Sequence, residues 1–162
     1  MTSAYEYIKK NLRANLKSKM IEWRTQDSIV RIEKPSDIGR ARNLGYKAKK
    51  GFIIVRVRLK RGSHRKPRPR KGRMSRNMTT RVALDMNYQW IAESRAAKKY
   101  PSLEILNSYK VARDGKQYWF EVILVDTAKP EIKNDPTINW ICNKKKRAFR
   151  GLTSAAKKAR GL

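Results

Sequence analysis

Hydrophobic residues recur every three or four positions near the start of the chain. Between residues 3 and 23 this stripe consists of Tyr5, Ile8, Leu12, Leu16, Met20 and Trp23. The spacing predicts an amphipathic helix, and Ser3 and Glu6 have the spacing of a capping box at its first turn. Asn11 and Asn15 weaken the helical pattern, so two shorter helices are an alternative. We expect the stripe to pack on the rest of the fold rather than lie on a membrane surface.

Strict alternation replaces the helical spacing at residues 52–60. Ile53, Val55, Val57 and Leu59 fall on one face, and Phe52, Ile54, Arg56, Arg58 and Lys60 fall on the other. The pattern predicts a strand with one buried face, and with a second face that is cationic in its far half. Residues 28–33 predict a short strand ended by Pro35, and residues 36–51 predict a polar loop punctuated by glycines.

A basic segment and a helix are predicted next. Residues 61–81 are rich in Arg, Lys, Pro and Gly, which favours an extended segment that folds onto a partner rather than a core. Residues 82–99 have a helical pattern, with Thr79 or Thr80 as a candidate N-cap and Pro101 just beyond the end.

Two β-rich runs follow, at residues 103–111 and 117–125, and Asp114-Gly115 lies between them. This combination predicts a β-hairpin. Both alternating sets of the second strand are mostly apolar, so this strand is expected to be buried on both faces.

The chain is therefore expected to have three parts. Residues 1–25 form an N-terminal helical segment, and residues 26–130 form a central α+β domain with an extended basic arm at 61–80. Residues 131–162 form a basic C-terminal extension, in which Thr153, or the serine after it, caps a short basic helix.

Charge adds information about partners. The chain has 41 Lys+Arg against 13 Asp+Glu, a formal net charge of +28. So much like charge requires a polyanion, which could be nucleic acid, an acidic membrane surface or an acidic protein. Hydrophobic residues make up 40% of the chain, so part of it must form a core. One Cys, no apolar run long enough to span a bilayer and no signal-peptide pattern lead us to expect a cytoplasmic protein without membrane contact.

Catalytic chemistry has little support. The only His and the only Cys are far apart in sequence, and a zinc site needs several such ligands. The acidic residues are scattered, and we expect them to be surface charges or turn residues: Asp85, Glu93, Glu104, Asp114, Glu121 and Asp126. Asp126 is the best isolated candidate for catalysis. Phosphate-binding glycine motifs are absent from the sequence. We expect no enzyme activity, no metal, no cofactor and no small-molecule substrate.

Nucleic-acid binding has stronger support because the cations form three clusters. The clusters are Arg40, Arg42, Lys47, Lys49 and Lys50; then Arg56, Arg58, Lys60, Arg61, Arg65, Lys66, Arg68, Arg70, Lys71 and Arg73; and finally Lys144, Lys145, Lys146, Arg147, Arg150, Lys157, Lys158 and Arg160. A targeting signal would account for one short cluster only. Arginine also forms fork-shaped hydrogen bonds with phosphate. No zinc-finger, basic-zipper or RRM-type motif is present, and arms rich in Pro and Gly suit an irregular folded RNA.

Several stretches resemble one family, the archaeal and eukaryotic large-subunit ribosomal protein L-fifteen-e. They are residues 40–58 (RARNLGYKAKKGFIIVRVR), Arg61-Gly62 with the basic run after it, residues 103–109 with 118–126, residues 132–140, and residues 150–162 (RGLTSAAKKARGL). The start at residues 4–8 is also similar. The similarity runs in order over nearly the whole chain.

The resemblance implies an α+β domain with a small mixed sheet and helices packed on it, plus extended basic arms. It implies a non-catalytic structural role in the large ribosomal subunit, with large-subunit ribosomal RNA and neighbouring ribosomal proteins as partners. It makes the loop at 45–51 and the arm at 60–76 RNA-contacting segments, which adds Tyr46, His64 and Arg76 to the expected contacts. Two alternatives are a chromatin-like protein that compacts DNA and an RNA-modifying enzyme.

Overall fold

A computed structural model describes most of the chain. The described residues are 3–62, 64–65, 67, 70–72, 76, 81–82 and 84–162, with only the backbone for 64, 65 and 81. The fold centres on a four-stranded sheet in the order β1-β2-β6-β5. The strands are β1 (Ile29–Ile32), β2 (Phe52–Lys60), β5 (Glu104–Arg113) and β6 (Gln117–Val125). The helices are α1 (Ala4–Ala14), α2 (Leu16–Thr25), α3 (Ile38–Asn43), α4 (Tyr88–Lys99), α5 (Pro130–Lys133), the 3-10 helix η1 (Asn139–Asn143) and α6 (Ser154–Ala159).

The α+β class is confirmed, but the pairings of this sheet are all antiparallel, so the sheet is not mixed. β6 lies between β2 and β5 and is buried over nearly its whole length, as its apolar alternation on both faces predicts. The predicted hairpin joins β5 to β6. Asp114 forms its turn, because the Asp114 Oδ1 atom accepts hydrogen bonds from the backbone N–H groups of Lys116 and Gln117.

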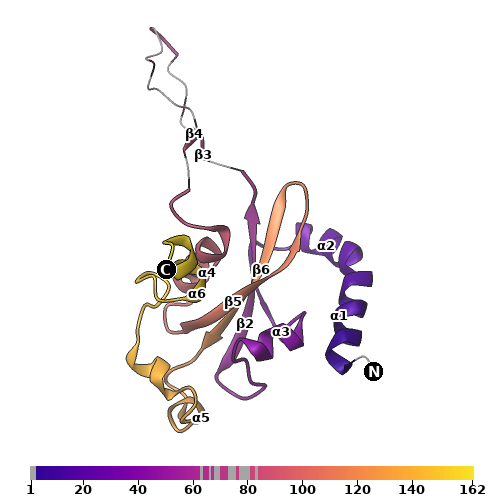
Figure 1. Ribbon diagram of the computed structural model, residues 1–162, viewed down its shortest axis with the longest axis vertical. Helices are drawn as coiled ribbons and strands as arrows, with labels where there is room; N and C mark the ends of the chain where they lie inside the picture. The colour runs from indigo at the N-terminus through magenta and orange to yellow at the C-terminus, as the bar shows by residue number, and fades with distance from the viewer. Residues whose placement is uncertain are drawn as a thin grey trace.

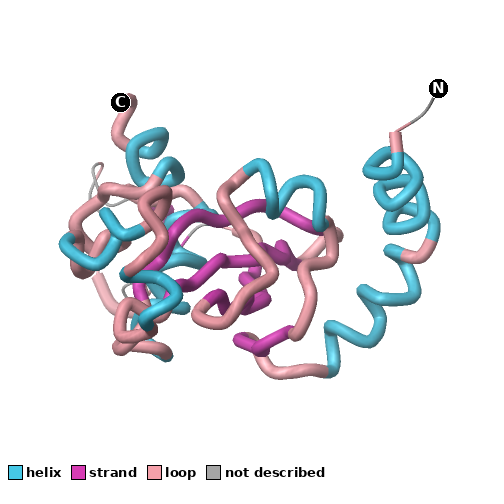
Figure 2. The backbone as a smooth tube through the Cα atoms, turned by 90° about the horizontal axis from the view of Figure 1, so that it is seen from below, coloured by secondary structure: helices cyan, strands magenta, loops and turns pink. Residues whose placement is uncertain are grey.

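Helices cover both faces of the sheet (Figures 1 and 2). α4 packs Ala92 and Ala96 against Val57, Phe120 and other buried residues of β2 and β6. Two alanines on one side of a helix allow it to lie close to the strands. Burial of each aliphatic side chain in this layer contributes about 1.5 to 3 kcal/mol.

The opposite face carries Trp119 and Tyr109. Trp23 of α2 packs against Trp119 and Ala112, with a ring-centroid distance of 6.2 Å between the two tryptophans. Ala41 of α3 packs against Tyr109 and other residues of this face. The second face of β2 is therefore partly covered: of the cations predicted in its far half, Arg56 is 9% exposed, Arg58 is half-buried and Lys60 is exposed.

The N-terminal stripe is divided between two helices, as the alternative with a break near Asn15 allowed. α2 buries Trp23, but α1 buries none of its residues, and Tyr5 and Ile8 are exposed. The prediction that the whole stripe packs on the fold is therefore wrong for α1. This helix contacts the body through α3, where the Tyr5 ring lies against Gly39. Its end of the molecule is opposite the C-terminus (Figure 2).

Two boundaries differ from the sequence prediction. The loop predicted at 36–51 contains α3, whose N-cap Asp37 accepts a hydrogen bond from the backbone N–H of Arg40 at 2.9 Å. The helix predicted from residue 82 begins at Tyr88, because the Asn87 side chain caps it through the backbone N–H of Trp90. Thr79 and Thr80 lie outside the described residues.

The segment after residue 126 adds to the core more than its composition indicates. Ile132, Ile138 and Ile141 are buried with Val125, the last residue of β6. α6 is capped by Thr153 as predicted and buries Ala155 and Ala156. The short strand β3 (His64–Arg65), within the predicted arm, pairs antiparallel with β4 (Arg81–Val82), which lies just beyond the predicted end of the arm, and both are away from the main sheet (Figure 1).

Candidate nucleic-acid interface

Two carboxylates that the sequence placed on the surface are buried instead. Glu121 lies on β6 opposite Arg56 of β2 and Tyr109 of β5. Its Oε2 atom accepts hydrogen bonds from the Tyr109 hydroxyl and from the backbone N–H of Ser36, and its Oε1 atom accepts one from the Ser36 hydroxyl. Burial raises the pKa of the Glu121 carboxyl above its ordinary value, and the donated hydrogen bonds and the Arg56 charge oppose that shift. The expected burial of this strand on both faces was the signal that could have found Glu121.

Glu93 is the second buried carboxylate. One of its oxygens accepts a hydrogen bond from the Ser108 hydroxyl on β5, and the other accepts one from the Thr153 hydroxyl. Burial raises the pKa of this carboxyl too. Because Thr153 also caps α6, Glu93 joins α4, β5 and the C-terminal segment. Both carboxyl groups are therefore buried hydrogen-bond acceptors that join elements of the fold, and the prediction that they are surface charges or turn residues is wrong.

Two candidate RNA-binding arginines lie inside the protein. The Arg56 guanidinium stands 4.2 Å from the centroid of the Trp23 ring and donates to the Gln26 side chain. Arg147 is 9% exposed, and its Nη1 atom donates to the carbonyls of Ile105 and Leu106. The strand register shifts there, so Arg147 satisfies carbonyls at a β-bulge. Burial lowers the pKa of both guanidinium groups, while nearby carboxylates oppose that shift.

The loop at 45–51 is fastened to the C-terminal segment by Asp135. Its Oδ2 atom lies 2.8 Å from Lys47 Nζ and 2.6 Å from Lys49 Nζ. The hydrogen bond from Lys47, followed by that from Lys49, lowers the pKa of the Asp135 carboxyl. Tyr46 is half-buried, with its ring edge-on to Phe52. Lys50 is exposed and has no ion-pair or hydrogen-bond partner among the described residues.

Arg40 and Arg42 are exposed on α3. The Arg42 guanidinium donates to the Tyr5 hydroxyl at 2.7 Å and lies 5.9 Å from the centroid of that ring. Arg40 lies 6.0 Å from the Tyr109 ring. Arg42 therefore links α3 to α1.

The end of β2 carries Arg58 and Arg61. Arg58 is half-buried and donates to the backbone carbonyls of Trp23 and Arg24, at the end of α2. Arg61 is exposed and lies 5.1 Å from the Tyr118 ring centroid, while its Nη1 atom donates to the Asp114 carbonyl at 2.8 Å.

Only part of the arm beyond Arg61 is described. Arg70, Lys71 and Arg76 are exposed. The backbone of His64 and Arg65 belongs to β3, and their side chains lie outside the described atoms. Lys66, Arg68 and Arg73 lie outside the described residues, so the structure does not address their predicted contacts.

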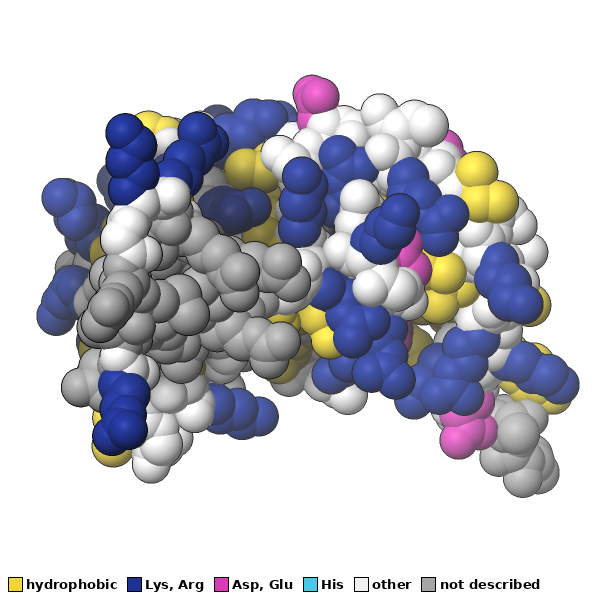
Figure 3. Space-filling view, turned by 90° about the horizontal axis from the view of Figure 1, so that it is seen from above, with side chains coloured by type: hydrophobic (Ala, Val, Ile, Leu, Met, Phe, Trp, Pro, Cys, Tyr) yellow, Lys and Arg dark blue, Asp and Glu magenta, His cyan; other side chains and the backbone are white. Residues whose placement is uncertain are grey.

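The exposed C-terminal candidates are Lys144, Lys145, Arg150, Lys157, Lys158 and Arg160. Arg160 donates to the Gly151 carbonyl at 2.7 Å and so closes the turn before α6. Figure 3 shows Lys and Arg side chains spread over one face, among very few acidic groups.

The N-terminal helices carry further exposed cations, which are not among the RNA-binding residues predicted from the sequence. Lys9, Lys10, Arg13, Lys17 and Lys19 are all exposed. The apolar stripe of this segment predicts only packing, whereas its density of cations is the signal that indicates a surface for a polyanion.

The described residues contain no group of three or more His, Cys, Asp or Glu placed to hold a metal ion. Asp126, the best isolated candidate for catalysis, is a turn residue whose Oδ1 atom accepts a hydrogen bond from the Ala128 N–H at 3.0 Å. In the same part of the chain, every helix is too short or too polar to cross a bilayer.

Comparison with known families agrees with this architecture. Residues 3–162 match the family model Ribosomal_L15e, whose description is Ribosomal L15. Members of this family are structural proteins of the large ribosomal subunit. The match covers both basic extensions and the core between them, and so the chain belongs to the ribosomal L15e family.

Proposed function

We propose that this protein binds and stabilises large-subunit ribosomal RNA through Lys/Arg–phosphate contacts, without catalysis, and adjoins neighbouring ribosomal proteins. The main observation in support is the imbalance of free surface charge. Of 13 acidic residues in the chain, Glu93 and Glu121 are buried, and Asp114 and Asp135 are ion-paired with cations. The exposed cations therefore greatly outnumber the exposed acids, and phosphate is the natural counterion.

The cations divide into two groups with different proposed roles. Arg56, Arg147, Lys47 and Lys49 are held by contacts within the protein and shape the surface. The proposed phosphate contacts come from cations that are exposed, although Arg42, Arg61 and Arg160 also donate to groups within the protein. They are Arg42, Lys50, Arg61, Arg70, Lys71, Arg76, Lys144, Lys145, Arg150, Lys157, Lys158 and Arg160, together with the cations of α1 and α2.

We also propose a division of roles along the chain. The central part at 26–130 supplies most of the fold. The segment at 1–25, the arm at 61–80 and the segment at 131–162 carry much of the RNA contact. The burial of Ile132 and Ile138 anchors the last of these segments to the sheet. It therefore presents its cations from a fixed position, which reduces the ordering cost of binding.

Salt dependence provides the test. Binding of the protein to large-subunit ribosomal RNA is measured over a range of salt concentrations, beside duplex DNA of equal length. We expect RNA to bind more tightly, with a log–log slope that reports about −0.7 to −0.9 per phosphate contact. Equal affinity for both polymers would favour the DNA-compacting alternative. A weak, salt-independent interaction would contradict the proposal as a whole.

A second measurement concerns the assembled particle. The protein should sediment with the large subunit at about one copy per particle and stay there through a moderate-salt wash, because its many contacts are released together rather than singly.

A further inference from the structure

We propose that the pocket between the end of β2 and the first turns of α4 binds one unpaired RNA nucleotide, with the base inside and the phosphate at the rim. This inference rests on the proposed RNA binding and specifies one contact within it. The pocket has a volume of about 560 Å³, within the usual range for sites that hold a compact ligand.

The pocket exists because β1 is shorter than β2. The backbone N–H of Arg58 donates to the Ser28 carbonyl at 2.8 Å, just before β1 begins. Beyond that point no strand among the described residues pairs with this edge of β2. Backbone groups of an antiparallel strand alternate in direction, so the N–H of Lys60 points to this same open edge. The pocket therefore has a backbone donor as well as side chains.

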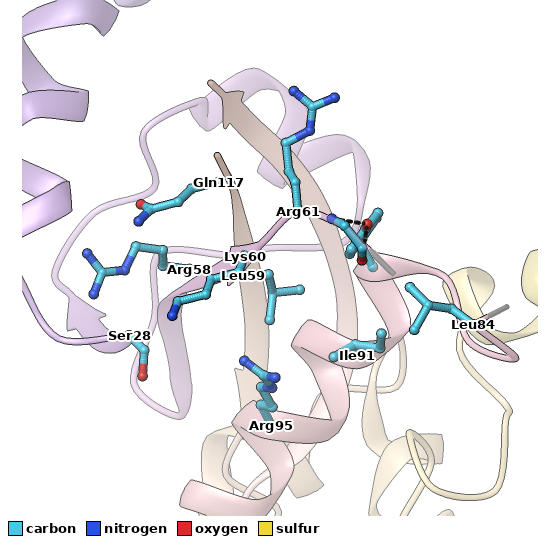
Figure 4. Close-up of a pocket in the computed structure, with 11 residues that line it drawn as sticks. Ser28, Arg58, Leu59, Lys60, Arg61, Leu84, Ile91, Arg95 and Gln117 are labelled. Carbon is cyan, nitrogen blue, oxygen red and sulfur yellow. Dashed lines mark hydrogen bonds between the residues drawn. The ribbon is translucent and has the colours of Figure 1, made fainter. Parts of the chain in front are cut away.

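Its inner wall is apolar. Leu59 is 2% exposed, and Ile91 and Leu84 lie across from it in Figure 4. Tyr88 completes the wall, and its ring packs against Tyr118 with 4.9 Å between ring centroids and a 40° angle between ring planes. The Tyr88 hydroxyl donates to the Gly62 carbonyl and accepts from the Gly62 N–H, each at 3.0 Å. These two bonds fix the ring, so the surface offered to a base is already in place.

The rim is cationic. Arg58, Lys60, Arg61 and Arg95 all line the pocket, and the lining residues include no acid. Figure 4 shows Arg61 and Arg95 on opposite sides of the apolar wall, with Arg58 and Lys60 beside it. The side chains of Lys60 and Arg95 have no hydrogen-bond or ion-pair partner among the described residues, so their charges are available to a phosphate.

This combination favours a nucleotide over other ligands. A phosphate alone would not require the apolar wall, and a neutral apolar ligand would not require four cations. Bases within a duplex remain stacked on their neighbours, so only an unpaired base could enter. Gly62, at the start of the basic arm, and Leu84, a few residues past its end, both line the pocket. An RNA strand that follows the arm would thus pass over this pocket.

Methyl NMR on the full-length protein tests where the base lies. The probes are a short single-stranded RNA, an abasic oligomer with the same number of phosphates, and an RNA duplex. We expect the single strand to shift the methyl resonances of Leu84 and Ile91 through the ring current of the base, whereas the other two probes leave them unchanged. The Ile132 methyl, buried in a separate cluster, is the internal reference.

Three outcomes would overturn the inference. Equal shifts from the abasic oligomer would mean that the pocket holds phosphate only. Equal shifts from an extended acidic peptide would identify the open edge of β2 as a strand-addition site. No shift from any probe would mean that the pocket is unused.

A pair of variants tests the rim. Arg95 and Lys98 are both exposed on α4, but only Arg95 lines the pocket. We expect Arg95→Ala to weaken binding of the single strand by about threefold to tenfold, because it removes one charge-assisted contact with phosphate. Lys98→Ala should weaken binding by less than about twofold, because it removes only a charge distant from the pocket. Equal effects would contradict the pocket. Failure of the wild-type protein to bind large-subunit RNA in a salt-dependent way would instead contradict the proposed function.

Discussion

At the scale of single residues, similar side chains have opposite roles. Arg147 and Arg150 are three positions apart, yet Arg147 lies inside and bonds two carbonyls at the bulge of β5, whereas Arg150 is exposed. The spacing of cations along the chain cannot distinguish the two arginines. They differ in burial because only Arg147 contacts the β-bulge in β5.

Arg147→Ala should therefore lower the free energy of unfolding by about 1 to 3 kcal/mol, since it leaves buried carbonyls without donors. Arg150→Ala should change it by less than about 0.5 kcal/mol. Urea unfolding followed by circular dichroism measures both. A similar loss for the two variants would mean that Arg147 is not the donor that the bulge requires.

The titration of Glu121 makes the free energy of unfolding depend on pH, and the direction of this dependence follows from the shift of its pKa. Burial raises the carboxyl pKa in the folded state, so folding favours the protonated form. The stability that this group contributes is present below its unfolded pKa of about 4.3 and is lost as the pH rises through the folded pKa.

Glu121→Gln removes that titration. The free energy of unfolding of the wild type, minus that of the variant, should decrease as the pH rises from about 4 to 7. Urea titrations at several pH values give this difference. A difference that stays constant or grows with pH would contradict a raised pKa at Glu121.

At the scale of elements, the strands were predictable and the N-terminal helices only partly so. Period-two patterns identified β2 and the β5–β6 hairpin because each strand buries one or two whole faces. A helical stripe, by contrast, predicts which side of a helix is apolar but not whether another element packs on that side. In α1 no residue is buried. α3 was missed because a six-residue helix that depends on an Asp37 cap and one buried alanine, Ala41, has no periodic signal.

The loop before β2 requires a glycine. Gly51 has φ +94°, and a Cβ atom there would lie 2.7 Å from Ile132 Cγ1, in the segment that follows β6. Gly51→Ala should lower the free energy of unfolding by about 1 to 3 kcal/mol through backbone strain and displacement of Ile132.

Gly115→Ala is the matched control, because its φ is unstrained and nothing lies within 4 Å of the added methyl group. Thermal unfolding should show that this variant loses less than about 1 kcal/mol in the free energy of unfolding. A Gly51 variant as stable as the control would mean that the loop and Ile132 can move apart at little cost.

At the scale of the whole molecule, the net charge of +28 was the most informative number in the sequence, and the family resemblance was the most specific feature. Charge indicated the partner class but could not separate free cations from those held by the fold. Lys49 illustrates the limit, because its partner Asp135 lies far away in sequence and meets it only through the packing of the C-terminal segment.

Combined variants should separate the two groups of cations in RNA binding. Replacement of the exposed Lys144, Lys145, Lys157 and Lys158 by Ala should reduce the magnitude of the log–log salt slope by about 3, at about 0.7 to 0.9 per contact. Lys49→Met should leave the slope unchanged, because its ammonium group is already paired with a carboxylate. Filter binding at four or more salt concentrations measures both. Equal slopes for the two variants would contradict the division into free and held cations.

The contact between Trp23 and Trp119 also provides an intrinsic spectroscopic signal for the position of the N-terminal helices. One indole belongs to the N-terminal helices and the other to the central sheet, with 6.2 Å between ring centroids and a 56° angle between ring planes. Two indoles at that distance and tilt couple their electronic transitions, and the coupling vanishes if α2 leaves the sheet. Near-ultraviolet ellipticity therefore follows the docking of the N-terminal segment in real time, without any label, during folding or as RNA is added.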